Sequence, residues 1–165
     1  LIWYWLIKAI SEFIRRITLR KMKLLKNFEP LPPDDGDEFY PNGIFEFNIT
    51  KLIYYISKNQ DIFQAEQVKV NTISSYSTTH LNEDTIMKAD LTTPIIMTEI
   101  SPDQFNVIDG HHRLEKARRE NVEAVLAYKI AAEHHYRFLT STKAYEQYVE
   151  YWDSKLKERE ENNAI

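Results

Sequence analysis

Phe105–Asn121 reads FNVIDGHHRLEKARREN and combines more groups capable of chemistry than any other stretch of this 165-residue chain. Phe105–Ile108 contains aromatic and β-branched residues, which favour a buried strand. Arg113–Glu120 contains strong helix formers and no Gly, Pro or β-branched residue. The pattern therefore predicts a strand that runs into a helix through the turn Asp109–His112.

The predicted turn is suited to binding an anion. The first backbone N–H groups of a helix lack intrahelical partners and lie at the positive end of the helix dipole, so they attract phosphate. Gly110 allows a sharp turn and a close approach of the backbone to a ligand. Arg113 offers a planar, permanently charged donor, and His111 and His112 can donate or transfer protons near neutral pH. Asp109 can accept a proton or bind a metal ion.

Two other interpretations of these residues remain open. In the first, Asp109 caps the helix, while His111, His112 and Arg113 form a solvated polar rim. In the second, the histidine pairs of the chain bind zinc together with Asp109, although adjacent side chains tend to point apart and no i, i+4 histidine pair supports such a site. A Mg²⁺ ion that arrives with a nucleotide needs only a carboxylate or two, with phosphates and water.

The same segment resembles the ParB/sulfiredoxin superfamily. The resemblance covers roughly residues 66–130 and rests on Pro94–Met97, Phe105–Arg113, Ala117 and the predicted strand Val122–Ile130. Partition protein ParB has G-E-R-R at the strand-to-helix turn, sulfiredoxins have G-C-H-R, and the related free-serine kinases have a sequence of the type D-G-H/N-H-R. The sequence D-G-H-H-R of this chain is most similar to that of the kinases.

The resemblance implies that the turn binds nucleotide phosphates, with ATP, ADP or CTP and Mg²⁺ as ligands. The phosphate-binding residues would be Gly110, His111, His112 and Arg113. Asp109 would act as a base or as a Mg²⁺ ligand, and His111 or His112 would stabilise the transferring group. The implied acceptor is a small hydroxyl compound such as serine.

One further acid is a candidate catalytic residue. In the related kinases an acidic residue after the first core strand helps to activate the substrate, and Glu83 is the nearest acid in this chain. The alternative is structural, because an acid in the first turn of a short helix complements the helix dipole.

Three functions fit these observations. The first is a phosphotransferase or NTP hydrolase, and the second is a nucleotide-responsive binding module without turnover. The third is a ParB-like DNA-binding or nuclease protein, in which the basic residues of the predicted helix would touch DNA: Arg113, Lys116, Arg118 and Arg119. The similarity to the kinase motif favours the first.

Composition narrows this choice. The chain has no cysteine, which excludes the sulfinic acid reduction that sulfiredoxins perform with the cysteine of G-C-H-R. The net charge of −4 divides into +6 on residues 1–27 and −10 on the remainder, and such an acidic body is a poor electrostatic partner for DNA. Only 35 residues follow the last predicted strand, so we do not expect the helix-turn-helix region with which partition proteins read operators.

We divide the chain into a basic, aromatic extension (1–21), an arm and helix (22–60), a ParB/sulfiredoxin-like core (61–132) and a C-terminal helical segment (133–165). The apolar run at the start spans about ten residues, whereas a membrane span needs about 20, so we predict no transmembrane segment. This run suits an amphipathic helix on a membrane surface, or a signal-like segment whose charges lie on the wrong side. We favour a third interpretation, in which residues 1–21 are foreign to the native protein, because the sequence from Met22 resembles a natural start. We expect a bacterial, cytoplasmic protein.

The remaining pattern predicts a small α+β domain with a mixed sheet of about four or five strands. Strands are expected at 68–73, 94–100, 105–109 and 122–130, and helices at 49–58, 83–89, 112–120 and 141–157. The expected helix caps are Asn48 for the first helix, Asn82 or a loop threonine for the second, and Ser141 for the last. Residues 158–165 are expected to form a frayed end. The acidic, proline-rich stretch 28–43 suits an extended arm, either a strap over the site or a linker.

Overall fold

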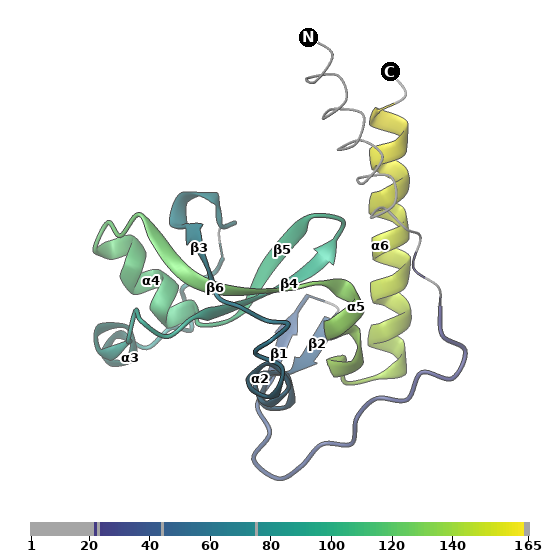
Figure 1. The fold of residues 1–165 in the computed structure, drawn as a ribbon, viewed down its shortest axis with the longest axis horizontal. Coiled ribbons are helices and arrows are strands. Elements are labelled where there is room, and N and C mark those ends of the chain that lie inside the picture. The colour runs from purple at the N-terminus through teal and green to yellow at the C-terminus, as the bar shows by residue number, and fades with distance from the viewer. Residues whose placement is uncertain (1–21, 23, 44, 75, 164–165) are drawn as a thin grey trace.

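The structure is a computed structural model that describes residues 22, 24–43, 45–74 and 76–163. It is a mixed α+β fold with two sheets, surrounding helices and a long C-terminal helix, which confirms the predicted class (Figure 1). The predictions for the extension 1–21 concern residues that lie outside the described part of the chain. Within the described part, every helix is too short or too polar to cross a bilayer.

The described elements follow one another along the chain as β1 (Phe39–Asn42), β2 (Phe45–Asn48), α2 (Ile49–Lys58), β3 (Glu66–Lys69), η1 (Val70–Thr72), α3 (Glu83–Lys88), β4 (Ile95–Ser101), β5 (Gln104–Asp109), α4 (His111–Arg119), β6 (Ala124–Ile130), α5 (Ala132–His135), η2 (Tyr136–Phe138) and α6 (Thr142–Asn162).

The larger sheet has the strand order β3-β6-β4-β5. Strands β4 and β6 are parallel, and the other two neighbouring pairs are antiparallel. The hairpin of β4 and β5 places Asp109, the last residue of β5, opposite Ile96. Because α4 begins only two residues later, the predicted strand-to-helix unit is confirmed, with Gly110 as the one residue between strand and helix.

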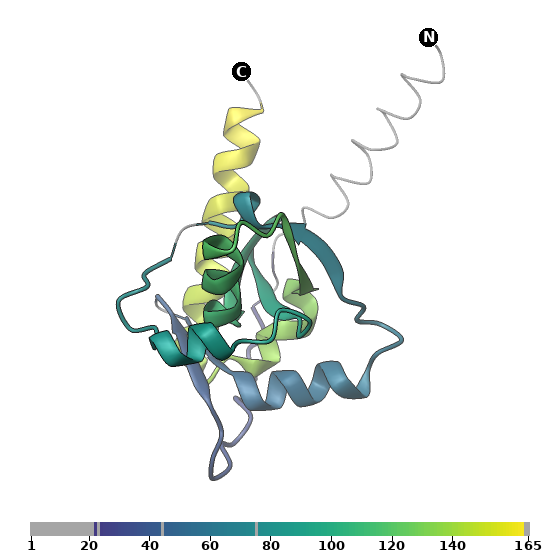
Figure 2. The same cartoon turned by 90° about the vertical axis from the view of Figure 1, so that its left-hand side faces the viewer.

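Alternation along the strands divides the buried side chains between the two faces of this sheet. Ile95 packs on one face with Leu114 and Ala117, the predicted inward residues of α4. Ile96 and Ile108 belong to a second cluster on the opposite face, as expected for a strand whose successive side chains point to opposite sides. Figure 2 views the molecule from the end that carries α3 and α4 and shows both helices in front of the sheet.

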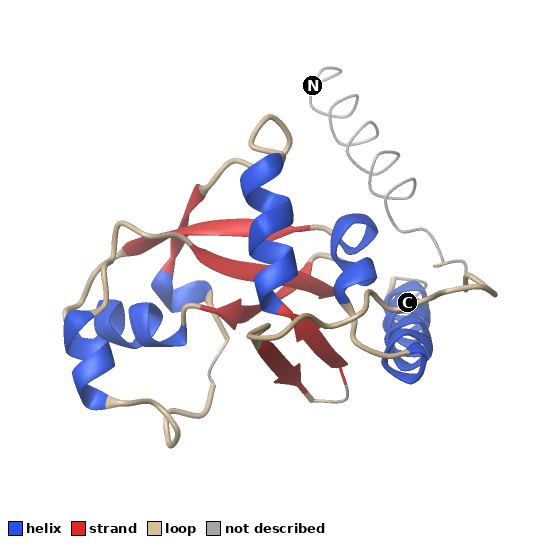
Figure 3. Ribbon diagram, turned by 90° about the horizontal axis from the view of Figure 1, so that it is seen from below, coloured by secondary structure: helices blue, strands red, loops and turns tan. Residues whose placement is uncertain are grey.

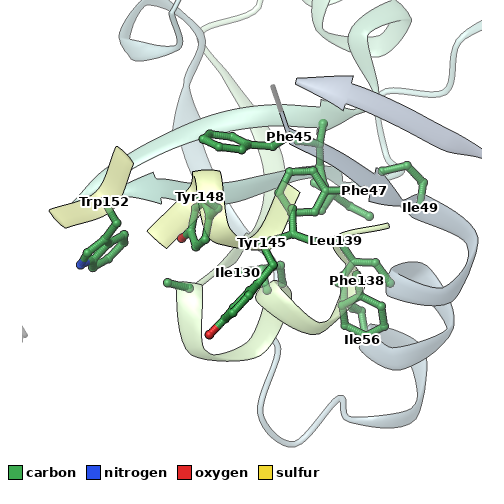
Figure 4. Close-up of a cluster of buried hydrophobic side chains, with 14 of the residues drawn as sticks. Phe45, Phe47, Ile49, Ile56, Ile130, Phe138, Leu139, Tyr145, Tyr148 and Trp152 are labelled. Atoms are coloured by element: carbon green, nitrogen blue, oxygen red, sulfur yellow. The ribbon is translucent and has the colours of Figure 1, made fainter. Parts of the chain in front are cut away.

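The second cluster joins the sheet to α2, β2, α5 and α6 (Figures 3 and 4). Helix α6 buries the apolar stripe predicted from its sequence, Tyr145, Tyr148, Val149 and Trp152. Phe47 of β2 is completely buried in the same cluster. At about 25 cal/mol per Å² of apolar surface, a stripe of this kind is a principal source of stability. The small sheet and the C-terminal helix are therefore parts of one folded unit with the larger sheet.

The expected helix caps are present. Asn48, Asn82 and Ser141 each accept a hydrogen bond from a backbone N–H in the first turn of the helix that follows. The helix α6 is longer than predicted, because residues up to Asn162 are helical rather than frayed. Ion pairs such as Lys155–Glu158 lie along this last part of the helix and stabilise it.

The first strand of the larger sheet is shorter than predicted. Pairing with β6 covers Glu66–Lys69, and the chain then forms the 3₁₀ turn Val70–Thr72. Val70 and Ile73 are both buried. A spacing of three residues brings two side chains to one side of a 3₁₀ turn, so the apolar pattern assigned to a strand belongs partly to this turn.

The acidic arm contains a strand that the sequence analysis missed. Phe39–Asn42 pairs with Phe45–Asn48 in an antiparallel hairpin. Asn42, the last residue of β1, pairs with Phe45, and Gly43 follows it with a φ of +67°. An Asn-Gly sequence beside aromatic residues is a hairpin signal. Pro41 lies within β1 and argued against a strand there, although proline is tolerated on an edge strand.

A buried polar group links α5, α6 and β4. His135 is completely buried, and its Nε2 lies 2.7 Å from the carbonyl oxygen of Glu99, which also accepts a hydrogen bond from the hydroxyl of Tyr148 at 2.7 Å. Burial lowers the pKa of His135 to about 4. The histidine is therefore neutral in the folded chain at pH values where an exposed histidine is charged.

We predict that acid destabilises the fold through His135. In the unfolded chain its pKa is about 6.5, so as the pH falls below that value the unfolded state binds the proton first and the free energy of unfolding decreases. The decrease is complete near pH 4 and amounts to roughly 3 kcal/mol. Urea denaturation of the wild type and of His135→Gln at a series of pH values measures it.

The glutamine variant keeps a donor for the Glu99 carbonyl but does not titrate. Burial raises the pKa of the Glu99 carboxyl, an effect of the opposite sign that is present in both proteins and cancels in the comparison. Equal pH slopes for the two proteins between pH 6.5 and 4 would contradict the assignment.

Candidate functional site

The turn between β5 and α4 depends on the conformation of Gly110. Its φ of +95° lies in the left-handed region, and it occupies the cap position of α4 without a side-chain hydrogen bond to the helix. A Cβ atom at this residue would lie 2.6 Å from Cγ2 of Ile95 and 2.8 Å from Nη2 of Arg113. Glycine is therefore required both for the backbone angle and for the space. The interpretation in which Asp109 caps the helix is wrong.

Asp109 and Arg113 form an ion pair across the turn. Nη2 of Arg113 lies 2.8 Å from Oδ2 of Asp109 and also donates to the carbonyl oxygen of Pro94 at 3.2 Å. The Nε atom of Arg113 is buried and has no hydrogen-bond partner among the described residues. The guanidinium is thus held beside the first turn of α4 with part of its donor capacity unused.

His111 is buried, which contradicts the interpretation of both histidines as a solvated rim. It is 8% exposed, and its Nε2 lies 3.2 Å from the hydroxyl of Tyr40. The Tyr40 ring stacks on the imidazole at 5.0 Å, and the Tyr76 ring meets it edge-on at 5.2 Å. Burial lowers the pKa of His111, against the opposing attraction of Asp109. A neutral imidazole can accept a proton.

His112 has a different environment from its neighbour. Its Nε2 lies 3.2 Å from the backbone nitrogen of Asn82 and, because a backbone N–H can only donate, carries a lone pair. Asn82 is the cap of α3, so His112 joins the start of α3 to the start of α4. The two adjacent histidines therefore point to different partners.

Glu83 is engaged in an ion pair with Arg119 of α4. Both of its carboxylate oxygens accept from Arg119, at 2.6 and 3.0 Å, and this bond lowers the pKa of Glu83. Arg119 also binds Glu115 at 2.8 Å. In this arrangement Glu83 joins α3 to α4. It also lies in the first turn of α3, as the structural alternative in the sequence analysis expects.

Two hollows adjoin the turn. The charged hollow has a volume of about 390 Å³, and its lining includes Asp84, Lys88, Asp90, Asp109, His112 and Arg113. The neutral hollow has a volume of about 290 Å³ and includes His111, Tyr40, Tyr76 and Asn106. The predicted site residues are thus brought to one turn but divided between two spaces, with His111 in the neutral hollow and His112 in the charged one.

Tyr40 and Tyr76 are site residues that the sequence analysis did not identify. Tyr40 comes from β1, so the arm that was weighed as a strap or a linker does reach the turn. Tyr76 comes from the loop after η1, donates its hydroxyl to Glu115 at 3.1 Å and stacks under the Arg118 guanidinium at 4.8 Å. The hairpin signal at Asn42 could have placed Tyr40, whereas no local signal marks Tyr76.

The remaining basic residues of α4 have protein partners. Lys116 donates to the backbone carbonyls of Met87 and Ala89, and Arg118 donates to that of Ile73. These hydrogen bonds attach α3 and the loop after η1 to α4. They do not form the free basic face that DNA binding through this helix requires.

The described residues do not form a metal site from protein ligands alone. No group of three or more His, Cys, Asp or Glu side chains within them is placed to bind a metal ion. His134 and His135 lie on α5, where His135 belongs to the buried polar group of the core. The zinc interpretation thus finds no support in this part of the chain.

No family model, curated protein or solved structure matches this chain.

We predict that Gly110→Ala destabilises the protein more than the same change at Gly36. Gly36 has a φ of +87°, and no atom lies within 4 Å of the position that a methyl group would take, so alanine there costs about 1–2 kcal/mol for the backbone angle alone. At Gly110 the contacts with Ile95 and Arg113 add overpacking of about 1–3 kcal/mol. Urea denaturation of both variants gives the two values. Equal losses would show that the space around Gly110 is not restrictive.

Proposed function

We propose that this chain binds the phosphates of a nucleotide, together with Mg²⁺, at the turn Asp109–Arg113 and acts as a phosphotransferase or NTP hydrolase. One observation carries the proposal. The start of α4 has no side-chain cap and opens beside a fixed guanidinium on the charged hollow. Free backbone N–H groups and an arginine side by side are the standard chemistry of phosphate recognition.

Arg113 would be the principal phosphate ligand. Its bonds to Asp109 and Pro94 both use Nη2, so they orient the planar group. We assign the other terminal nitrogen, Nη1, to a phosphate oxygen. Gly110 would let the phosphate approach the backbone, because a side chain at this residue has no room.

The carboxylates of the charged hollow fit a Mg²⁺ ion that arrives with the nucleotide. Asp84, Asp90 and Asp109 all line this hollow. Both oxygens of Asp90 already accept hydrogen bonds from Thr92 and Thr93, and Asp109 is paired with Arg113. The protein alone therefore offers few free ligands, and Mg²⁺ would need phosphate oxygens and water to complete its octahedral shell.

Phosphoryl transfer also requires the movement of a proton. When a hydroxyl oxygen bonds to the terminal phosphorus, the bond from phosphorus to the bridging oxygen breaks and the nucleoside diphosphate leaves. The hydroxyl proton needs an acceptor, and the carboxylate of Asp109, which lines the charged hollow, would take it. His112 would face the transferring group from the charged hollow.

The fold supports the resemblance to the ParB/sulfiredoxin superfamily on which the nucleotide assignment rests. A β-hairpin, one glycine and a helix deliver D-G-H-H-R to the edge of a four-stranded mixed sheet. Since no relative was found, the family assignment depends on this motif and its geometry.

A second candidate is a nucleotide-responsive module without turnover. The ion pair between Asp109 and Arg113 favours it, because a phosphate that binds Arg113 competes with the carboxylate and changes the bonding of the turn. DNA binding through α4 is disfavoured by the protein partners of Lys116 and Arg118.

We predict that Arg113→Ala weakens nucleotide binding at least tenfold, since a charge-assisted hydrogen bond contributes about 1.5–3 kcal/mol. Calorimetric titration with ATP, ADP, CTP and tripolyphosphate measures binding. Phosphorus NMR with Mg²⁺ and each nucleotide, with and without L-serine, measures turnover. Nucleotide binding with turnover supports the enzyme, and binding without turnover supports the module.

The matched control is Arg119→Ala, which removes a guanidinium from the same helix but outside the charged hollow. This variant should bind nucleotide as the wild type does. Equal losses in both variants would mean that helix charge, rather than the turn, attracts the ligand. If the wild type binds none of the four compounds, the phosphate assignment is wrong.

A further inference from the structure

The neutral hollow differs in chemistry from the charged hollow beside it. None of its described lining residues is Asp, Glu, Lys or Arg, whereas the charged hollow includes three aspartates, a lysine and an arginine. Two charged side chains near this hollow already have partners. Glu115 accepts a hydrogen bond from the Tyr76 hydroxyl, and the Arg118 guanidinium lies over the Tyr76 ring. An ionised ligand that enters this hollow would lose its hydration without gaining a partner of opposite charge, which is unfavourable.

Rings and small polar groups share the lining of this hollow. The rings belong to Tyr40, Tyr76, Phe105 and His111, and Asn106 supplies an amide. Ser74 and Ser77 add hydroxyl groups at the same surface. Amides and hydroxyls can both donate and accept, which matches a ligand whose hydroxyls do the same. Flat rings provide apolar faces against which the C–H groups of a saturated ring can pack.

We propose that the neutral hollow binds an uncharged sugar ring, either as a free sugar or as the ribose of a nucleoside. Its volume of about 290 Å³ lies just below the roughly 300–1,000 Å³ typical of small-molecule sites, which suits a ligand as small as a single sugar ring. The same neutral lining offers no ion-pair partner to a zwitterionic amino acid such as serine and therefore favours the sugar.

The pair of Tyr40 and His111 offers the sugar a hydrogen-bonding group. Nε2 of His111 and the hydroxyl of Tyr40 are 3.2 Å apart, and both residues line the hollow. A sugar hydroxyl can bond to the Tyr40 hydroxyl at this pair. Sugar binding does not rest on the proposed function.

Saturation-transfer NMR with the full wild-type chain, without nucleotide, tests the proposal. The ligands are D-ribose, D-glucose, adenosine, adenine and L-serine. We expect transfer to the sugar-ring protons and none to serine. Adenosine binding without ribose or glucose binding would assign the ring to a nucleoside, and the reverse would assign it to a free sugar. Equal binding of adenine and adenosine, or binding of serine alone, would overturn the proposal.

Backbone amide shifts of the wild type locate the ligand without any substitution. Changes should concentrate at Tyr40, Ser74, Tyr76 and Asn106 and leave Lys88 of the charged hollow unaffected. Changes around the charged hollow instead would refute the assignment.

A matched pair of variants tests the importance of neutrality. Asn106→Asp adds a charge to the hollow with almost no change of shape and replaces the amide that donates to Oδ1 of Asn42 at 3.4 Å. It should weaken sugar binding at least tenfold. Asn162→Asp adds the same charge at the exposed end of α6 and should leave binding unchanged. Circular dichroism confirms that both variants are folded. Equal affinities for all three proteins would overturn the proposal.

The two proposals fail separately. Sugar binding by a chain that binds no nucleotide or tripolyphosphate would support the sugar site and refute the proposed function. Nucleotide binding that Arg113→Ala abolishes, without any sugar binding, would support the proposed function and overturn the sugar site.

Discussion

The close contact between Gly110 and Ile95 is the constraint on which the rest of the site depends. It lets β5 end and α4 begin one residue apart, with the backbone in a left-handed conformation that a side chain would block. The same contact brings Arg113 back over the turn, where it pairs with Asp109. A helix that started later would have lost both the guanidinium and the free N–H groups at the end of the sheet.

The turn is divided between two environments. Consecutive helical residues point about 100° apart, so His111 enters a neutral, aromatic space while His112 enters a charged one. In the proposed phosphoryl transfer, the charged space would take the nucleotide phosphates. The arm contributes Tyr40, which packs on His111. Hydrogen bonds from Lys116 to the Ala89 carbonyl and from Arg118 to the Ile73 carbonyl fix residues that line the two spaces.

Much of the site was predictable because its determinants are local. The change from strand to helix propensity, the single glycine and the charged residues after it all lie within Phe105–Asn121. Caps such as Asn48 and Ser141 were predictable for the same reason, since each bonds to its own helix. The strand expected at 68–73 was partly wrong because Val70 and Ile73, three residues apart, lie on one side of a 3₁₀ turn, whereas in a strand they would point to opposite faces.

Local patterns thus determined the strand-to-helix turn and the class of fold, and the phosphate-binding hypothesis follows from the same few residues. Which groups surround the turn required the folded chain, because Tyr40 and Tyr76 reach His111 from segments far away in sequence. The lowered pKa of His111 and the engagement of Glu83 by Arg119 likewise depend on burial and on long-range partners. Such contacts depend on how helices and strands pack, so they cannot be predicted from the residues that are neighbours in the sequence.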